Sequence, residues 1–242
     1  MTATLLAHVE LFAAIPAMVL ILAMAFARVR SPTVGARSAL QHFAAGVVFA
    51  TVAVELLPDV TRSHAVLEVV SGFAVGVALM LVIRRLAVDA PSEAADAGIG
   101  LPVAMLTAVG VDILMDGLLV GLGFAVGAKE GGMVTAALAA ELLSLGLALG
   151  SSLGASAWSR VITVATVEAA MLLIGSAIGA SFVSRLSEHA LAAVLAFGCA
   201  ALLFLVTEEL LVEAHEAGES AFATAMFFVG FLLFLVIGMV AG

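Results

Sequence analysis

The sequence has few charged residues and few residues suited to disulfide or nucleic-acid chemistry. Of its 242 residues, nine are lysine or arginine, one is cysteine and none is tyrosine. A lone cysteine cannot form an intrachain disulfide, so Cys199 gives no indication of the redox compartment. The net charge is -9, and no basic patch is present that would neutralise phosphates. These absences exclude a nucleic-acid partner.

Apolar residues dominate the chain and predict an all-α integral membrane protein. The hydrophobic fraction is 64% and the mean hydropathy is +1.28, which leaves too little polar surface to cover a soluble particle. Helices of about 20 apolar residues cross a hydrocarbon core of about 30 Å. Eight such runs lie approximately at 10–27, 39–58, 65–83, 101–127, 133–154, 161–183, 191–212 and 221–240. Their connections are short, so we expect a single transmembrane domain over residues 1–242.

The basic residues between these runs predict that both termini lie outside the membrane-bounded compartment. In this orientation six arginines fall on the cytoplasmic side: Arg28, Arg30, Arg37, Arg84, Arg85 and Arg160. Three basic residues fall outside: Arg62, Lys129 and Arg185. The missing tyrosine, the abundant alanine and valine and the short loops favour the inner membrane of a prokaryote.

Seven carboxylates interrupt the apolar runs. They are Glu55, Asp112, Asp116, Glu141, Glu168, Glu208 and Glu209. An ionisable side chain at membrane depth costs at least a few kcal/mol, so each of these acids must be paired, protonated or bound to an ion. No lysine or arginine lies inside any run. The acids therefore indicate a cation, with protons as the competing explanation.

The fourth and fifth runs hold the strongest candidate site. Asp112 and Asp116 are four residues apart, which places them on one helix face about 5 to 6 Å apart at Cβ. Glu141 and Ser144 share a face of the fifth helix in the same way. Both runs also carry glycines at small-xxx-small spacing, namely Gly117, Gly121, Gly123 and Gly127, then Gly146, Gly150 and Gly154. We expect these glycines to let the two helices pack backbone to backbone, which would gather the acids and Ser144 into an all-oxygen cluster, with Glu168 of the sixth run as a further contributor.

Two helix ends resemble each other. The second run ends in Glu55-Leu56-Leu57-Pro58-Asp59, and the seventh ends in Glu209-Leu210-Leu211-Val212-Glu213. In the predicted orientation the two copies point in opposite directions through the membrane, as an inverted repeat of a secondary transporter would. A chance likeness between two amphipathic helix ends explains so short a similarity equally well.

Stretches in five of the expected spans follow, in order, the motifs of one membrane-protein family. Residues 112–117 (Asp-Ile-Leu-Met-Asp-Gly) fall on a His-Asn-x-Pro-Glu-Gly pattern, and residues 140–144 (Ala-Glu-Leu-Leu-Ser) fall on a His-Glu-x-Pro-His type pattern. Glu168-Ala169, followed by Gly175, resembles a Glu-Pro pair before a glycine-rich stretch. Residues 43–59 are similar to an Ala-Ala-Gly to His-Leu-Leu-Pro-Glu stretch, and residues 208–216 to a His-Glu-Leu-x-Pro-Glu-Ala-His-Glu stretch. Through these stretches the chain resembles the ZIP (Zrt/Irt-like) divalent-metal transporters.

The resemblance implies eight transmembrane helices in a 3+2+3 arrangement with an inverted repeat. The three parts would be helices 1–3 (about 10–83), helices 4–5 (about 101–154) and helices 6–8 (about 161–240). It also implies carrier-type transport of a divalent metal ion. The metal ligands that it implies are Asp112, Asp116, Glu141, Ser144 and Glu168. Four ionised acids would exceed the charge of one divalent ion, so some should carry protons, which predicts proton coupling or proton competition.

Several positions depart from the family pattern, and they change the expected metal. Asp112 stands where the family has its first histidine, and Ser144 where it has histidine or glutamate. Carboxylates and a hydroxyl form a harder ligand set than imidazoles, which shifts preference from zinc towards manganese, magnesium or ferrous iron. Ile113 and Ala140 replace two further ligands, so we expect one metal site where the family has two. Met115 and Leu143 replace both motif prolines, so neither helix needs the family's kink.

Four residues are weaker candidates for an ion or proton pathway: Glu55, Glu208, Glu209 and His215. For His215 a solvated helix end is the simpler interpretation. Two other functions stay open, namely proton-linked transport of a non-metal substrate and metal binding without transport. An enzyme is not expected, because Asp112 and Asp116 share one helix, no Gly-x-Gly-Asp sequence is present and no buried Ser/His pair exists. The sequence leaves open the direction of transport, the coupling ion and whether the chain forms a homodimer.

Overall fold

The structure is a computed structural model that describes residues 3–241 except 89–102, 155, 184–185 and 217–219. The described residues are helical apart from short connections and contain no strand. The longer helices are α1 (Ala3–Val29), α2 (Val34–Thr51), α4 (Val66–Val88), α5 (Val103–Val126), α6 (Ala128–Ser152), α7 (Trp158–Val183), α8 (Glu188–Phe204) and α10 (Ala221–Ala241). Two short helices, α3 (Leu57–Arg62) and α9 (Leu211–Glu216), continue α2 and α8.

Among the described residues, eight helices are long and apolar enough to cross a membrane, which confirms the all-α class and agrees with the eight runs expected from the sequence. The observed helices extend past several of the expected runs because hydropathy detects the apolar centre of a span, whereas capped polar ends continue it. At the start of α2, for example, the Thr33 side chain accepts a hydrogen bond from the Ala36 backbone N–H. Residues 101–102 of the fourth expected run and Arg185 lie outside the described part.

The second and seventh spans each contain a π-helical segment. The segment η1 (Val52–Leu56) joins α2 to α3, and η3 (Leu205–Leu210) joins α8 to α9. Each π-helical segment therefore contains the glutamate of one of the two similar sequence stretches, Glu55 in η1 and Glu209 in η3. A π-helical turn inside an α-helix is rare and is frequent at functional sites.

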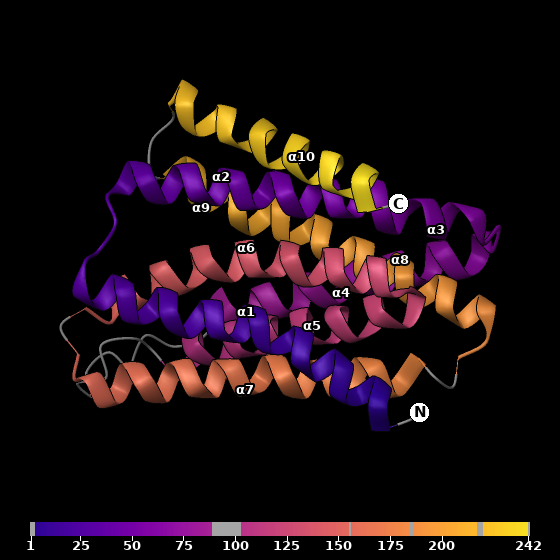
Figure 1. Ribbon diagram of the computed structural model, residues 1–242, viewed down its shortest axis with the longest axis horizontal. Helices are drawn as coiled ribbons and strands as arrows, with labels where there is room; N and C mark the ends of the chain where they lie inside the picture. Colours follow the sequence, from indigo (N-terminus) through magenta and orange to yellow (C-terminus); the bar gives the residue numbers. More distant parts are fainter. Residues whose placement is uncertain (1–2, 89–102, 155, 184–185, 217–219, 242) are drawn as a thin grey trace.

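The spans lie side by side along the long axis of the molecule (Figure 1). The start of α1 and the end of α10 lie at the same end of this bundle, as an even number of spans requires (Figure 1). The most extensive helix pairs are α5 with α7, α1 with α6, α2 with α10, and α4 with α8. α6, the fifth span, also contacts α2 and α5, so it joins the pair α2–α10 to the pair α5–α7.

The glycine stripes of the fourth and fifth spans face away from each other, so the expected glycine-mediated contact between these spans is wrong. A Cβ added at Gly117 would lie 2.9 Å from the Ser176 backbone nitrogen of α7. One added at Gly150 would lie 2.8 Å from Met24 Cα of α1. Gly123 is the exception, because its added Cβ would lie 3.1 Å from Gly131 Cα in α6.

Helical periodicity explains this arrangement. In α5, Gly117 and Gly121 follow Asp112 by five and nine residues, which turns them about 140° and about 180° away from the acid. Gly146 and Gly150 follow Glu141 by the same intervals in α6. The glycines thus bind each helix closely to an outer neighbour, and the acidic faces of α5 and α6 are left to meet each other.

Candidate metal centre

Three carboxylates meet between α5 and α6. Asp112, Asp116 and Glu141 each offer one carboxylate oxygen, and these oxygens all lie within 4.8 Å of one another. Asp116 and Glu141 are buried, with 3% and 2% of their surface exposed, and Asp112 is half-buried. Both helices run unbroken through the site, in agreement with the absence of the motif prolines. We call these three residues the acidic cluster.

In the part of the chain that the structure describes, no basic side chain pairs with the acidic cluster. Asp116 Oδ2 and Glu141 Oε2 are buried without a hydrogen-bond partner. Among the described residues, none of the ion pairs involves a member of the cluster. The carboxyl groups of Asp116 and Glu141 lie within hydrogen-bonding reach of each other. Two ionised carboxylates repel at such a separation, so this geometry requires either a shared proton or a bound cation.

A fourth acid, Glu209, belongs to the electrostatic environment of the cluster. It lies on η3, close enough to interact electrostatically with Asp112, Asp116 and Glu141. The sequence places Glu209 among the weaker pathway candidates, because its distance from residues 112–141 along the chain gives no sign of this proximity. Its place inside an apolar run and at the glutamate of the repeated Glu-Leu-Leu stretch are the features of the sequence that mark it.

The other two expected ligands, Ser144 and Glu168, lie on different helices. Ser144 is buried on α6, three residues after Glu141. Glu168 is buried on α7, where its Oε2 would lie 3.2 Å from a Cβ added at Gly110 of α5. Gly110 precedes Gly117 by seven residues and so shares its helix face. The structure therefore places Glu168 against the glycine face of α5, opposite the face that carries Asp112 and Asp116, and does not bring it to the cluster.

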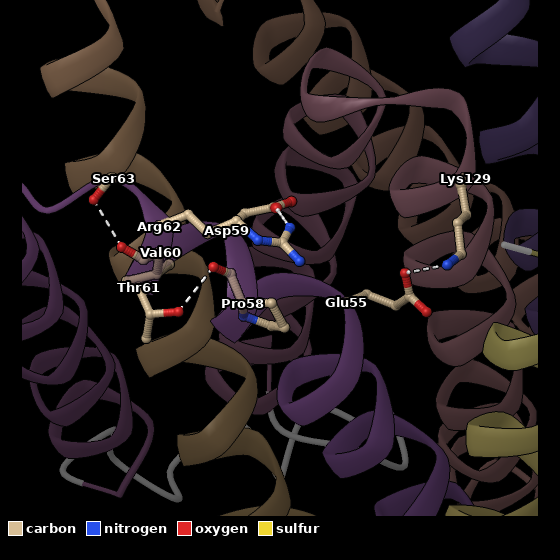
Figure 2. A network of polar contacts seen from close by, with 8 residues as sticks. All are labelled: Glu55, Pro58, Asp59, Val60, Thr61, Arg62, Ser63 and Lys129. Carbon is tan, nitrogen blue, oxygen red and sulfur yellow. Dashed lines mark hydrogen bonds and ion pairs between the residues drawn. The ribbon is translucent and has the colours of Figure 1, made fainter.

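Glu55 has a basic partner, which the sequence did not indicate. Figure 2 shows the Lys129 side chain reaching Glu55, with Lys129 Nζ 3.4 Å from Glu55 Oε2. The Glu55 side chain is 3% exposed and that of Lys129 is 35% exposed. Lys129 precedes Glu141 by twelve residues in α6, or about 18 Å along the helix axis. Glu55 is thus far from the acidic cluster and nearer the end of the bundle where α3 lies.

Polar contacts surround α9 at the opposite end of the bundle. Glu208 forms an ion pair with Arg84 of α4. Gln41 Nε2 of α2 donates a hydrogen bond of 2.5 Å to Glu213 Oε2. His215 is exposed, and its ring centroid lies 5.2 Å from that of the buried His42. Together these contacts fasten η3 to α4 and α9 to α2.

No protein-family model matches this chain, and no curated protein shows significant sequence similarity to it.

Proposed function

We propose that this protein is a divalent-cation transporter of the inner membrane with a ZIP-like design, and that the acidic cluster is its central binding site. The observation that carries the proposal is the meeting of Asp112, Asp116 and Glu141 within the apolar spans, with two buried carboxylate oxygens that have no partner. Such a group is costly in a membrane unless a cation or proton compensates it. A divalent ion would bind all three carboxylates and remove their mutual repulsion.

The ligand chemistry favours a hard cation. Every ligand atom that the acidic cluster offers is a carboxylate oxygen, with Glu209 near enough to add a fourth negative charge. Compared with sites that contain imidazole, sites made only of oxygen ligands shift the preference from zinc towards manganese, magnesium and ferrous iron. Three carboxylates carry one negative charge more than a divalent ion neutralises. We therefore infer that binding of the metal is coupled to a change in protonation of the cluster.

The packing of the spans supports an inverted 3+2+3 arrangement. Exchanging α1 with α7, α2 with α8, α4 with α10 and α5 with α6 converts the pair α2–α10 into α8–α4. The same exchange converts α1–α6 into α7–α5. Under the same exchange η1 and α3, which follow α2, correspond to η3 and α9, which follow α8. Transporters built from inverted repeats hold the substrate near the midplane, where the acidic cluster lies within α5 and α6.

A line of acids leads from the acidic cluster towards the α9 end of the bundle. Glu209 interacts electrostatically both with the cluster and with Glu213, one helical turn further along the same span. In the orientation given by the basic residues, with both termini outside, this is the cytoplasmic end. We infer that the ion leaves by this route and passes the carboxylates in turn. Its release would follow the movement of one bundle of helices against another in the bilayer.

The decisive experiment combines thermal unfolding with uptake into proteoliposomes. Purified protein is tested with manganese, ferrous iron, zinc, cadmium and magnesium. We expect manganese or ferrous iron to stabilise the wild type and to enter vesicles, and Asp116→Asn to lose both responses. Glu10→Gln is a matched control, because Glu10 accepts a hydrogen bond from Ser176 and lies outside the cluster. Absence of any metal response in the wild type would overturn the proposal.

One observation favours a second function, proton-linked transport of a non-metal substrate. The carboxyl groups of Asp116 and Glu141 are close enough to share a proton as well as to bind a metal together. This function predicts that vesicles conduct protons without added metal and that none of the five metals changes the unfolding temperature. Measurement of proton flux in metal-free vesicles, with Asp116→Asn as the inactive variant, separates the two functions.

A further inference from the structure

A second buried carboxylate lies outside the acidic cluster and is not used by the proposed transport site. Glu168 on α7 is 2% exposed, and its Oε2 has no hydrogen-bond partner. It lines a cavity of about 330 Å³ between α5 and α7. The volume falls within the range of small-molecule sites in proteins.

The cavity is otherwise almost entirely apolar. Its walls include Leu114 and Val111 from α5 and Val167 and Met171 from α7. Thr107 and Thr163 also line it, and the Thr163 hydroxyl already donates a hydrogen bond to the Ser159 carbonyl. A single acid among aliphatic side chains offers too few oxygens to replace the hydration shell of a metal ion. It matches an organic cation that has one charge and an apolar body.

The cavity opens towards the lipid. Val111 and Val167, which line it, are 37% and 48% exposed and lie on two helices long and apolar enough to cross a membrane, so we infer that their exposed sides meet the lipid. A ligand that partitions into the membrane can therefore reach Glu168 without crossing the acidic cluster. Gly110 leaves room beside the carboxylate, because a Cβ there would lie 3.2 Å from Glu168 Oε2.

We propose that the cavity between α5 and α7 binds a membrane-soluble primary amine, with its ammonium group on Glu168 and its hydrocarbon chain along Leu114 and Met171. The ammonium group supplies the hydrogen bond that Glu168 Oε2 lacks, and the positive charge offsets the carboxylate in a low-dielectric setting. The apolar walls cover the chain. This binding does not depend on the proposed transport of metal.

The test compares two probes of equal length, dodecylamine and dodecanol, in lipid nanodiscs that contain the full chain. We expect dodecylamine to raise the unfolding temperature of the wild type saturably and dodecanol to have no such effect. Glu168→Gln should weaken amine binding by at least about tenfold, because the charge-assisted hydrogen bond is lost. Asp116→Asn should bind the amine as the wild type does, which keeps this result separate from that of the metal experiment.

Two further measurements test the amine site even if Glu168→Gln folds poorly. Gly110→Ala should weaken amine binding, because its new methyl group fills the space beside the carboxylate. Dicyclohexylcarbodiimide, which reacts with carboxyl groups in apolar surroundings, should label Glu168 in the wild type, and dodecylamine should protect it. Equal stabilisation by dodecanol, or labelling that dodecylamine does not reduce, would show that the cavity holds only hydrocarbon chains and would overturn the proposal.

Discussion

Asp116 on α5 and Glu141 on α6 lie within hydrogen-bonding reach of each other, and each keeps one buried carboxylate oxygen without a partner. This relationship determines how the centre of the molecule should respond to a metal and to a proton. In the absence of both, two buried negative charges repel across the interface of two spans. Either ligand relieves the repulsion, but a divalent ion also attracts Asp112 and Glu209.

Replacing Asp116 by asparagine should separate the stability of the empty protein from its response to metal. The amide is isosteric and uncharged, so it removes the repulsion with Glu141 and Asp112, and we expect the unfolding temperature without metal to rise. The shift caused by manganese should disappear, and uptake should fall by at least about tenfold, because a charged ligand is lost. A manganese shift equal to that of the wild type would contradict a metal site at this position.

The affinity for metal should decrease as the pH falls from about 7.5 to about 5.5. Carboxylates bind a metal in their deprotonated form, so protons compete with the ion and each binding event releases the protons that the cluster held. Manganese titrations at several pH values measure the affinity, and a pH indicator in weak buffer measures the released protons. An affinity that does not change over this range would rule out protonation of the cluster as a partner of metal binding.

The number and approximate positions of the long apolar helices could be predicted from the sequence because hydropathy and helix length are local properties. The meeting of Asp112, Asp116 and Glu141 was expected from spacing, although the assumed cause was wrong: the glycines of α5 and α6 face α7 and α1. Helical periodicity alone places Gly117 away from Asp112. The same periodicity places Gly110 on the glycine face of α5. The sequence does not show that Glu168 of α7 packs against this face, so it could not separate Glu168 from the cluster.

Two contacts could not be predicted because they depend on the packing of distant segments. Glu209 reaches the acidic cluster from the π-helical segment η3, and neither the change of helix type nor its direction follows from residue preferences. Lys129 pairs with Glu55 although 74 positions separate them along the chain. A sequence without pairing information gives no reason to choose Lys129 over another basic residue.

Replacing Lys129 by methionine should destabilise the protein, because it leaves the Glu55 carboxylate buried without its cation. Lys129 is partly exposed, so we expect a loss of about 2 kcal/mol in the free energy of unfolding, between the values for surface and buried pairs. The double variant Lys129→Met, Glu55→Gln should recover most of this loss, since no unpaired charge remains. Additive effects of the two single substitutions in a double-mutant cycle would show that the pair is not coupled.

Two glycine-to-alanine substitutions test the packing of α5 on α7 against intrinsic helix preference. A Cβ at Gly117 would meet the Leu172 backbone carbonyl of α7, which cannot move aside without displacing the helix, so we expect Gly117→Ala to destabilise by about 1 to 3 kcal/mol. Gly132→Ala is the matched control, because nothing lies within 4 Å of a Cβ there and alanine should stabilise α6 by about 0.5 to 1 kcal/mol. Thermal unfolding of both variants in the same detergent measures the difference. If Gly117→Ala were as stable as Gly132→Ala, α5 and α7 would not approach as closely as the structure indicates.

Because the contact between α5 and α7 also holds Glu168 beside Gly110, Gly117→Ala should weaken amine binding between these helices, while Gly132→Ala leaves it unchanged.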